Sequence, residues 1–138
     1  MDYHYMTLID RYPVDVKNHA KRVAKLASLY GEDYKMVALL HDILEDTNTT
    51  EDEIPDIYRE DVITLTRKAT ETYFEYIERV SEGSKRAITI KLLDLEDHLK
   101  NIETLKPSLE KRYYKAYKML IKKEFSFRPY TCSNSFFI

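Results

Sequence analysis

Apolar residues recur at steps of three and four along most of this chain, which is the spacing of a buried face on an α-helix. Between residues 16 and 30 this face consists of Ala20, Val23, Ala24, Ala27 and Tyr30. Further helices are expected at residues 33–44, 57–66, 73–82, 84–105 and 109–124. The chain has only 2 glycines and 4 prolines, fewer than the turns of an all-β chain of this size would need. The sequence therefore predicts an all-α fold.

The expected helix boundaries depend on residues that cap or break helices. The signals are caps at Asp33, Thr50, Thr72, Ser84 and Ser108, stops at Gly31 and Gly83, and a break at Pro107. Glu53 completes a capping box with Thr50, so a short helix is expected to begin there. The length of 138 residues favours one domain, which we place at residues 1–125. Residues 126–138 show no helical period and are expected to form a C-terminal tail.

Composition limits which cellular compartment and which binding partners are expected for the chain. The formal net charge of -2 gives no reason to expect a nucleic-acid partner, although a small anionic substrate is allowed. Cys132 is the only cysteine, so neither an intramolecular disulfide nor a cysteine zinc cluster can form. The N-terminus carries no signal segment, and no apolar run approaches the roughly 18 residues of a membrane helix. These features predict a soluble, cytoplasmic protein without a membrane partner.

Four polar residues interrupt the apolar pattern of the second expected helix. Glu45 lies four positions after His41 and three after Asp42. Asp46 lies four positions after Asp42, so all four residues are on one side near the end of a helix. Three carboxylates at that end repel one another and also the partial negative charge of the helix C-terminus. A bound divalent cation would remove this conflict. The segment therefore predicts a metal site.

Two further residues are candidates to complete the ligand set. His19 lies on the first amphipathic helix, and Asp94 lies in a hydrophobic stretch where an unpaired carboxylate is costly. A set of imidazole and carboxylate ligands favours Mn, Fe, Zn or Ni over Ca. The alternatives are a half-buried structural role for His19 and, for Asp94, a salt bridge with Lys91 or Lys100.

The order His19, then His41-Asp42, then Asp94 resembles that of the HD-domain phosphohydrolases. Within this family, residues 41–47 are similar to the HDxxEDT motif of the RelA/SpoT-type hydrolase domain and its small stand-alone relatives. Residues 91–94 are similar to its KLAD segment, and residues 19–24 to its HPLRVA segment. Thr64-Leu65-Thr66-Arg67, followed by Tyr73-x-x-Tyr76-Ile77, also resembles the small stand-alone members.

The resemblance implies a compact HD-domain helical bundle with one central metal, held by His19, His41, Asp42 and Asp94. Mn2+ is the expected metal, with Fe, Zn, Ni and Co as alternatives. The implied reaction removes pyrophosphate from the 3′ position of guanosine alarmones, with Glu45 and Asp46 as catalytic residues. The alternative for this acidic pair is repulsion of neighbouring chains or capping of the loop.

Three further residues are candidate substrate contacts. Arg22 and Lys91 lie within one turn of ligand residues, so they are expected either to bind phosphate or to balance charge. His98 occupies the position where the family commonly has an asparagine that contacts the nucleotide, and the alternative is a surface histidine. Residues 11–13 also replace the basic, glycine-containing approach to the first histidine of the family.

The function hypothesis is a metal-dependent phosphohydrolase, a guanosine-3′,5′-bis(diphosphate) 3′-pyrophosphohydrolase. The first alternative is an HD-type nucleotidase or phosphodiesterase that acts on another nucleotide, and the second is a non-catalytic nucleotide-binding regulator. The expected partner is a phosphorylated nucleotide. The tyrosines Tyr113, Tyr114 and Tyr117 are interpreted either as packing residues or as the surface of a homodimer.

Overall fold

The computed structural model describes residues 7–101 and 105–127, apart from the side chains of residues 124–127. Within these ranges every regular element is helical, which confirms the predicted all-α fold. The elements are α2 (Val14–Ala27), η1 (Ser28–Tyr30), α3 (Glu32–Leu40), α4 (Ile43–Asp46), η2 (Glu51–Glu53), α5 (Asp56–Thr64), α6 (Tyr73–Ser81), α7 (Lys85–Lys100) and α8 (Pro107–Phe127).

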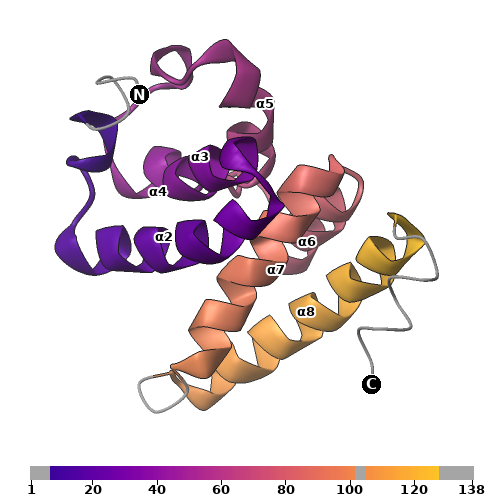
Figure 1. Cartoon of the computed structure of the whole chain (residues 1–138). Helices are drawn as coiled ribbons and strands as arrows, with labels where there is room; N and C mark the ends of the chain where they lie inside the picture. Colours follow the sequence, from indigo (N-terminus) through magenta and orange to yellow (C-terminus); the bar gives the residue numbers. More distant parts are fainter. Residues whose placement is uncertain (1–6, 102–104, 128–138) are drawn as a thin grey trace.

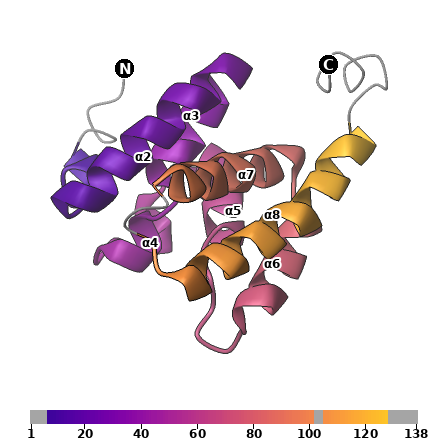
Figure 2. The same cartoon turned by 90° about the horizontal axis from the view of Figure 1, so that it is seen from below.

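Helix α7 forms the centre of the molecule and contacts α2, α3, α5, α6 and α8 (Figures 1 and 2). Helices α2 and α3 pack on each other at one side of α7, and α8 lies along α7 at the other. Every residue of α7 from Ala87 to Leu95 is buried, because neighbouring helices cover it all round. A polar side chain in the middle of α7 is therefore removed from water unless a pocket opens beside it.

Side-chain caps begin two of the helices where the sequence predicts them. The Thr72 hydroxyl accepts a hydrogen bond from the amide of Glu75 (3.2 Å), and the Glu75 carboxylate accepts one from the amide of Thr72 (2.8 Å). The Ser84 hydroxyl accepts from the amide of Ala87 at 3.0 Å and begins α7. Gly31 separates η1 from α3 with φ 129°, a conformation that side chains disfavour, which explains the stop.

The expected continuous helix at residues 33–44 is wrong, because it breaks between Leu40 and Ile43. Asp42 has φ -103° and ψ 4°, outside the helical region. The His41 ring donates from Nδ1 to the carbonyl of Ala38 at 2.5 Å. A continuing α-helix would use that carbonyl for the amide of Asp42. The side-chain hydrogen bond therefore competes with helix propagation at this position.

The last helix also differs from its prediction, since it begins at Pro107 rather than after a cap at Ser108. Proline is well suited to the first helical position, where its missing N–H would have no helical partner. The helix ends at Phe127, so it includes the first two residues of the expected tail. Residues 128–138 lie outside the described part of the chain.

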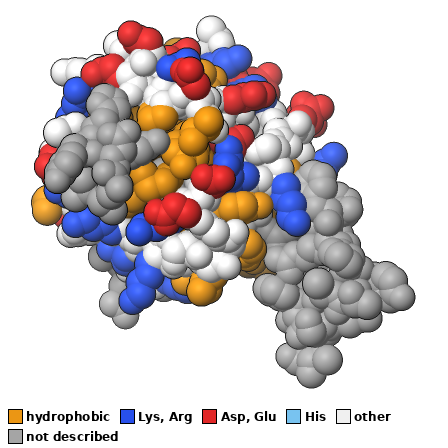
Figure 3. Space-filling view, turned by 45° about the horizontal axis from the view of Figure 1, so that its top comes forward, with side chains coloured by type: hydrophobic (Ala, Val, Ile, Leu, Met, Phe, Trp, Pro, Cys, Tyr) orange, Lys and Arg blue, Asp and Glu red, His pale blue; other side chains and the backbone are white. Residues whose placement is uncertain are grey.

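The surface shows mixed charge. Figure 3 shows Lys and Arg side chains interspersed with Asp and Glu on one face, around a smaller hydrophobic area. This face offers no continuous positive field of the kind that a nucleic-acid backbone would need. Among the described residues, no helix combines the length and the hydropathy that crossing a membrane requires.

Candidate metal centre

Helices α2 and α7 and the break after α3 bring the four expected metal ligands together. His19 comes from α2, His41 follows the end of α3, Asp42 lies in the break before α4, and Asp94 lies in the middle of α7. One ligand atom from each side chain lies within 4.8 Å of the others. Residues up to 75 positions apart in the sequence thus form one cluster.

The donor atoms of this cluster point at one another. Nε2 of His19 lies 2.6 Å from Oδ1 of Asp94, and Nε2 of His41 lies 3.2 Å from the same oxygen. Oδ2 of Asp42 lies 3.1 Å from Nε2 of His41 and 4.0 Å from Nε2 of His19. Two imidazole nitrogens and two carboxylate oxygens therefore converge on one volume, which is a ligand set for a divalent transition metal.

The hydrogen bonds made by the Nδ1 atoms of His19 and His41 show that this donor set fits a metal, because they leave each Nε2 atom available to the ion. Nδ1 of His41 contacts the carbonyl of Ala38, which can only accept a hydrogen bond, so the proton lies on Nδ1. Nδ1 of His19 contacts Oδ2 of Asp97 at 2.6 Å and donates to that carboxylate. Both Nε2 atoms can therefore offer a lone pair to a bound ion, as ligand histidines do.

Without a metal, the carboxylates of the cluster favour the protonated form of both histidines, and Lys91 offsets part of their negative charge. Burial would lower the pKa of His41, but the charge and hydrogen bonds of Asp42 and Asp94 raise it well above its ordinary value. The pKa of His19 is raised in the same way, with Asp94 as the main opposing cause to burial. Burial would raise the pKa of Asp94, but Lys91 and the histidines hold it well below its usual range. Metal binding must displace these protons.

Lys91 faces the cluster rather than the open pocket. Its Nζ lies 2.8 Å from Oδ2 of Asp94, and its side chain is buried. Nζ also lies 5.1 Å from the centre of the Tyr76 ring, within the range of a cation–π contact. The proposed phosphate contact of Lys91 stays a prediction, and the observed contact is with the ligand Asp94.

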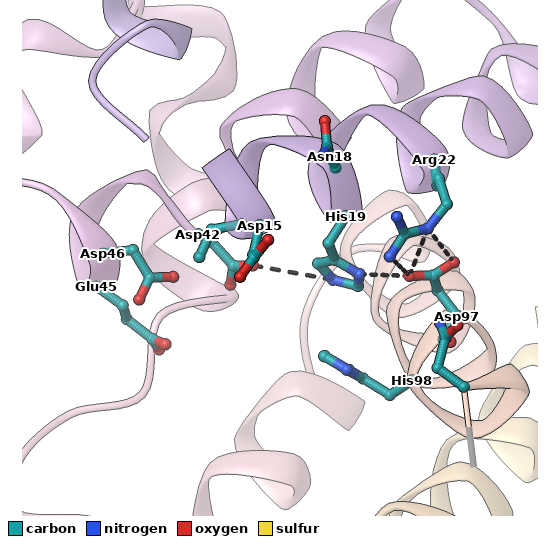
Figure 4. A pocket seen from close by; sticks show the side chains of 11 residues that line it. Asp15, Asn18, His19, Arg22, Asp42, Glu45, Asp46, Asp97 and His98 are labelled. Carbon is teal, nitrogen blue, oxygen red and sulfur yellow. Dashed lines mark hydrogen bonds and ion pairs between the residues drawn. The ribbon is translucent and has the colours of Figure 1, made fainter. Parts of the chain in front are cut away.

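A pocket of about 690 Å3 opens beside the cluster, and the two expected catalytic carboxylates line it. Figure 4 shows Glu45 and Asp46 on the opposite side of Asp42 from His19. Oε1 of Glu45 accepts a hydrogen bond from the amide of Arg67 at 2.6 Å. Burial raises the pKa of Glu45 and of Asp46 above the ordinary values. A carboxylate with a raised pKa beside a metal site is suited to accept a proton.

Arg22 and His98 also line this pocket. The Arg22 guanidinium binds Asp97 through Nε and Nη2, at 3.0 Å and 2.9 Å, while its side chain stays 51% exposed. The His98 ring stacks on the His19 ring, with centroids 4.4 Å apart, and on the Tyr113 ring at 5.0 Å. Both residues are placed where a ligand in the pocket could touch them, and their contacts with substrate stay predictions.

Asp97 is the residue of this site that the sequence analysis missed. It is 6% exposed, and its carboxylate joins His19 to Arg22. The signal that could have revealed it is its position three residues after Asp94, on the side of the helix that also carries His98. Further lining residues not singled out from the sequence are Asp15, Val16, Asn18 and Asn101.

The fold and the buried His and Asp cluster define a class of protein: all-helical domains in which two histidines and two aspartates form a site suited to a divalent metal. A family model described as HD domain matches residues 16–116, which is more than half of the chain. The chain therefore belongs to the HD domain family. This confirms the family resemblance carried by His19, His41-Asp42 and Asp94. The identity of the metal is a separate question, and Mn2+ stays a prediction.

Two similar proteins extend the comparison. The guanosine-3′,5′-bis(diphosphate) 3′-pyrophosphohydrolase MESH1 of Drosophila melanogaster is 31% identical over 103 residues, which cover 66% of this chain and 58% of the relative. The chain thus spans less than two thirds of that relative. The solved structure of a metazoan ortholog of SpoT that hydrolyzes ppGpp superposes with a TM-score of 0.70 at 21% identity. The match covers 90% of this chain and 86% of that one, and it shows a shared fold.

Proposed function

We propose that this protein hydrolyses guanosine 3′,5′-bis(diphosphate) at its 3′ position and releases pyrophosphate, with Mn2+ as its metal. The observation that carries the proposal is the pair Glu45 and Asp46, which lines the same pocket as the metal ligands His19 and Asp42. The pair belongs to the HDxxEDT pattern of residues 41–47. The similarity to the MESH1 hydrolase supports the same substrate.

In this proposal His19, His41, Asp42 and Asp94 would hold one divalent ion, whose charge would make a nearby water more acidic and would polarise a phosphoryl oxygen. Glu45 accepts the proton of the attacking water, since its raised pKa is closer to neutral pH than that of an exposed glutamate. The amide of Arg67 orients the Glu45 carboxylate. Asp46, on the same wall of the pocket, orients the water from a second direction.

The proposed reaction consumes one water. Its oxygen forms a bond to the phosphorus attached to the ribose 3′ oxygen, and the bond between that phosphorus and the ribose oxygen breaks. The 3′ oxygen takes up a proton, and pyrophosphate leaves. The pocket of about 690 Å3 falls within the range of small-molecule sites. Arg22, which lines the pocket, supplies a cation for the phosphates. His98 offers the edge of its ring to the base, because the ring faces stack on His19 and Tyr113.

A second candidate function is hydrolysis of a different phosphorylated nucleotide. The observation that favours it is His98, whose ring stacks between His19 and Tyr113 where the family commonly has an asparagine. A site that lacks one hydrogen bond to the base loses discrimination between bases. A non-catalytic regulator is less well supported, because the pocket retains both Glu45 and Asp46.

The experiment is a hydrolysis assay of the protein loaded with Mn2+, on a panel of nucleotides that includes guanosine 3′,5′-bis(diphosphate). The expected products from that compound are guanosine 5′-diphosphate and pyrophosphate, resolved by chromatography. Metal-free protein is the control. Release of orthophosphate, or consumption of another nucleotide while the alarmone remains intact, contradicts the proposed substrate and favours the second candidate. Metal binding without turnover of any nucleotide favours the regulator.

A further inference from the structure

Asp97 is a buried carboxylate to which the proposed hydrolysis assigns no step. The residue is 6% exposed, and its carboxylate accepts hydrogen bonds from Arg22 and His19. A buried anion is costly unless it is paired, so these contacts explain how it is tolerated.

The hydrogen bonds of Asp97 divide between the two carboxylate oxygens. Oδ2 accepts from Nδ1 of His19 (2.6 Å) and from Nη2 of Arg22 (2.9 Å). Oδ1 accepts from Nε of Arg22 at 3.0 Å. Figure 4 shows these contacts as dashed lines between α2 and α7. The forked guanidinium thus holds both oxygens of the carboxylate, and the carboxylate in turn holds the imidazole.

We propose that Asp97 is a positioning residue for the metal centre: it keeps the proton of His19 on Nδ1 and turns Nε2 toward the ion, and Arg22 holds Asp97 in place. Neither residue touches the metal in this arrangement. Carboxylates that accept a hydrogen bond from a ligand histidine fix its tautomer and ring orientation and increase its basicity. The inference concerns metal binding and holds whichever nucleotide the protein cleaves.

The substitution Asp97→Asn is an informative test because it keeps the shape of the side chain and exchanges one oxygen for an NH2 donor. If that NH2 group faces Arg22, two donors oppose each other. If it faces His19, it can only donate to Nδ1, which drives the imidazole proton to Nε2, the atom that must bind the ion. The first arrangement leaves His19 with a neutral acceptor that Arg22 no longer holds firmly, and the second removes the lone pair that must bind the ion, so both weaken metal binding.

The test measures the dissociation constant of Mn2+ for the purified protein in the absence of nucleotide, from the electron paramagnetic resonance signal of free Mn2+. Asp97→Asn should raise the dissociation constant about 10–100-fold, the range for loss of a contact to a ligand histidine. Arg22→Gln should raise it by a smaller factor. Glu96→Gln is the matched control, since it removes an equal charge from the adjacent position, where the carboxylate contacts Tyr117 in α8. That variant should bind Mn2+ like the wild type.

A second readout follows the His19 proton itself. In protein loaded with Zn2+, which is diamagnetic, the Nδ1 proton of His19 should give a slowly exchanging NMR resonance that is missing in Asp97→Asn. If Asp97→Asn does not fold, Arg22→Gln carries the test, because the Arg22 side chain is half exposed and its loss leaves no buried cavity. An unchanged dissociation constant in the folded variants, or an equal weakening by Glu96→Gln, would overturn the proposal.

Discussion

At the scale of single residues, Glu45 and Asp46 differ in how they are held. Glu45 is anchored by the amide of Arg67, in the segment between α5 and α6, while Asp46 ends the single turn of α4. Neither carboxylate belongs to the cluster formed by the four ligand side chains. Substitution of either residue should therefore reduce turnover without reducing metal binding.

Glu45→Gln and Asp46→Asn should retain one bound metal and lose turnover by about 10²-fold or more, the scale of general acid–base catalysis. Elemental analysis measures the metal, and the nucleotide assay measures turnover. Glu78→Gln, at an exposed position of α6, is the matched control and should leave both unchanged. Wild-type turnover in both pocket variants would refute the catalytic assignment.

At the scale of elements, the segment between α5 and α6 is held by Arg79 of α6. Its guanidinium binds the Glu71 carboxylate at 2.6 Å and the carbonyls of Thr64 and Thr66 at 3.1 and 2.9 Å. This network also positions Arg67, whose amide reaches Glu45. The ion pair between Arg79 and Glu71 is thus connected to the wall of the candidate active site.

Glu71→Gln should lower the free energy of unfolding near neutral pH by about 1.5–3 kcal/mol, the range for a hydrogen bond to a charged group. The hydrogen bond from Arg79 is the main cause that lowers the pKa of Glu71 to about 2. Because the folded-state pKa is depressed, the stabilisation is complete above the unfolded value of about 4.3 and is lost as pH falls toward 2.

The measurement is denaturant unfolding of wild type and Glu71→Gln across this pH range. The difference in stability should be constant above about pH 5 and shrink below about pH 4.3. Glu82→Gln, at an exposed position that follows α6, is the control. A difference that stays the same down to pH 2 would show that the carboxylate charge is not what stabilises the segment.

The turn between α6 and α7 needs a glycine because of a close approach. A Cβ at Gly83 would lie 2.9 Å from Cγ2 of Thr64 and 3.1 Å from the carbonyl of Val80. Gly83→Ala should therefore reduce stability by about 1–3 kcal/mol, the usual cost of overpacking. In a Thr64→Ser background, which removes Cγ2, the same substitution should cost less. Equal costs in both backgrounds would exclude the contact with Thr64 as the cause.

At the scale of the whole molecule, the metal site joins elements that are distant in sequence. The ligands come from α2, the break after α3, and α7, so an ion that binds them all links two sides of the bundle. Because the unfolded chain does not hold these ligands together, the free energy of binding adds to the stability of the fold.

Mn2+ at about 100 times its dissociation constant should increase the free energy of unfolding of metal-free protein by about 2.7 kcal/mol, and a chelator should reverse the effect. Thermal unfolding with and without the ion measures this. Asp94→Asn should abolish the response. Asp42→Asn, at a less buried ligand, serves if the first variant does not fold. If Mn2+ still increased the free energy of unfolding of both variants, the ion would have to bind at a different site.

Many features of this protein were predictable from its sequence because they depend on interactions between residues that are close in the chain. Helix formation, the caps at Thr72 and Ser84, and the stop at Gly31 depend on neighbours within four residues, so spacing alone indicates them. The ligands His19 and Asp94 were recognisable because polar side chains on apolar helix faces are costly without a partner. The order of the ligands then pointed to the HD domain family.

Other features were decided only by tertiary structure. Spacing placed Lys91 beside Asp94 but could not show that burial turns its ammonium toward that carboxylate rather than toward substrate. The break at Asp42 depends on where the His41 ring finds an acceptor, and the contact of Asp97 with His19 spans 78 residues. Such contacts depend on how α2 and α7 pack. That packing depends in turn on the apolar surface that all the helices bury together. A local pattern therefore identifies the groups that can bind a metal, whereas only the packed bundle determines which partners hold them.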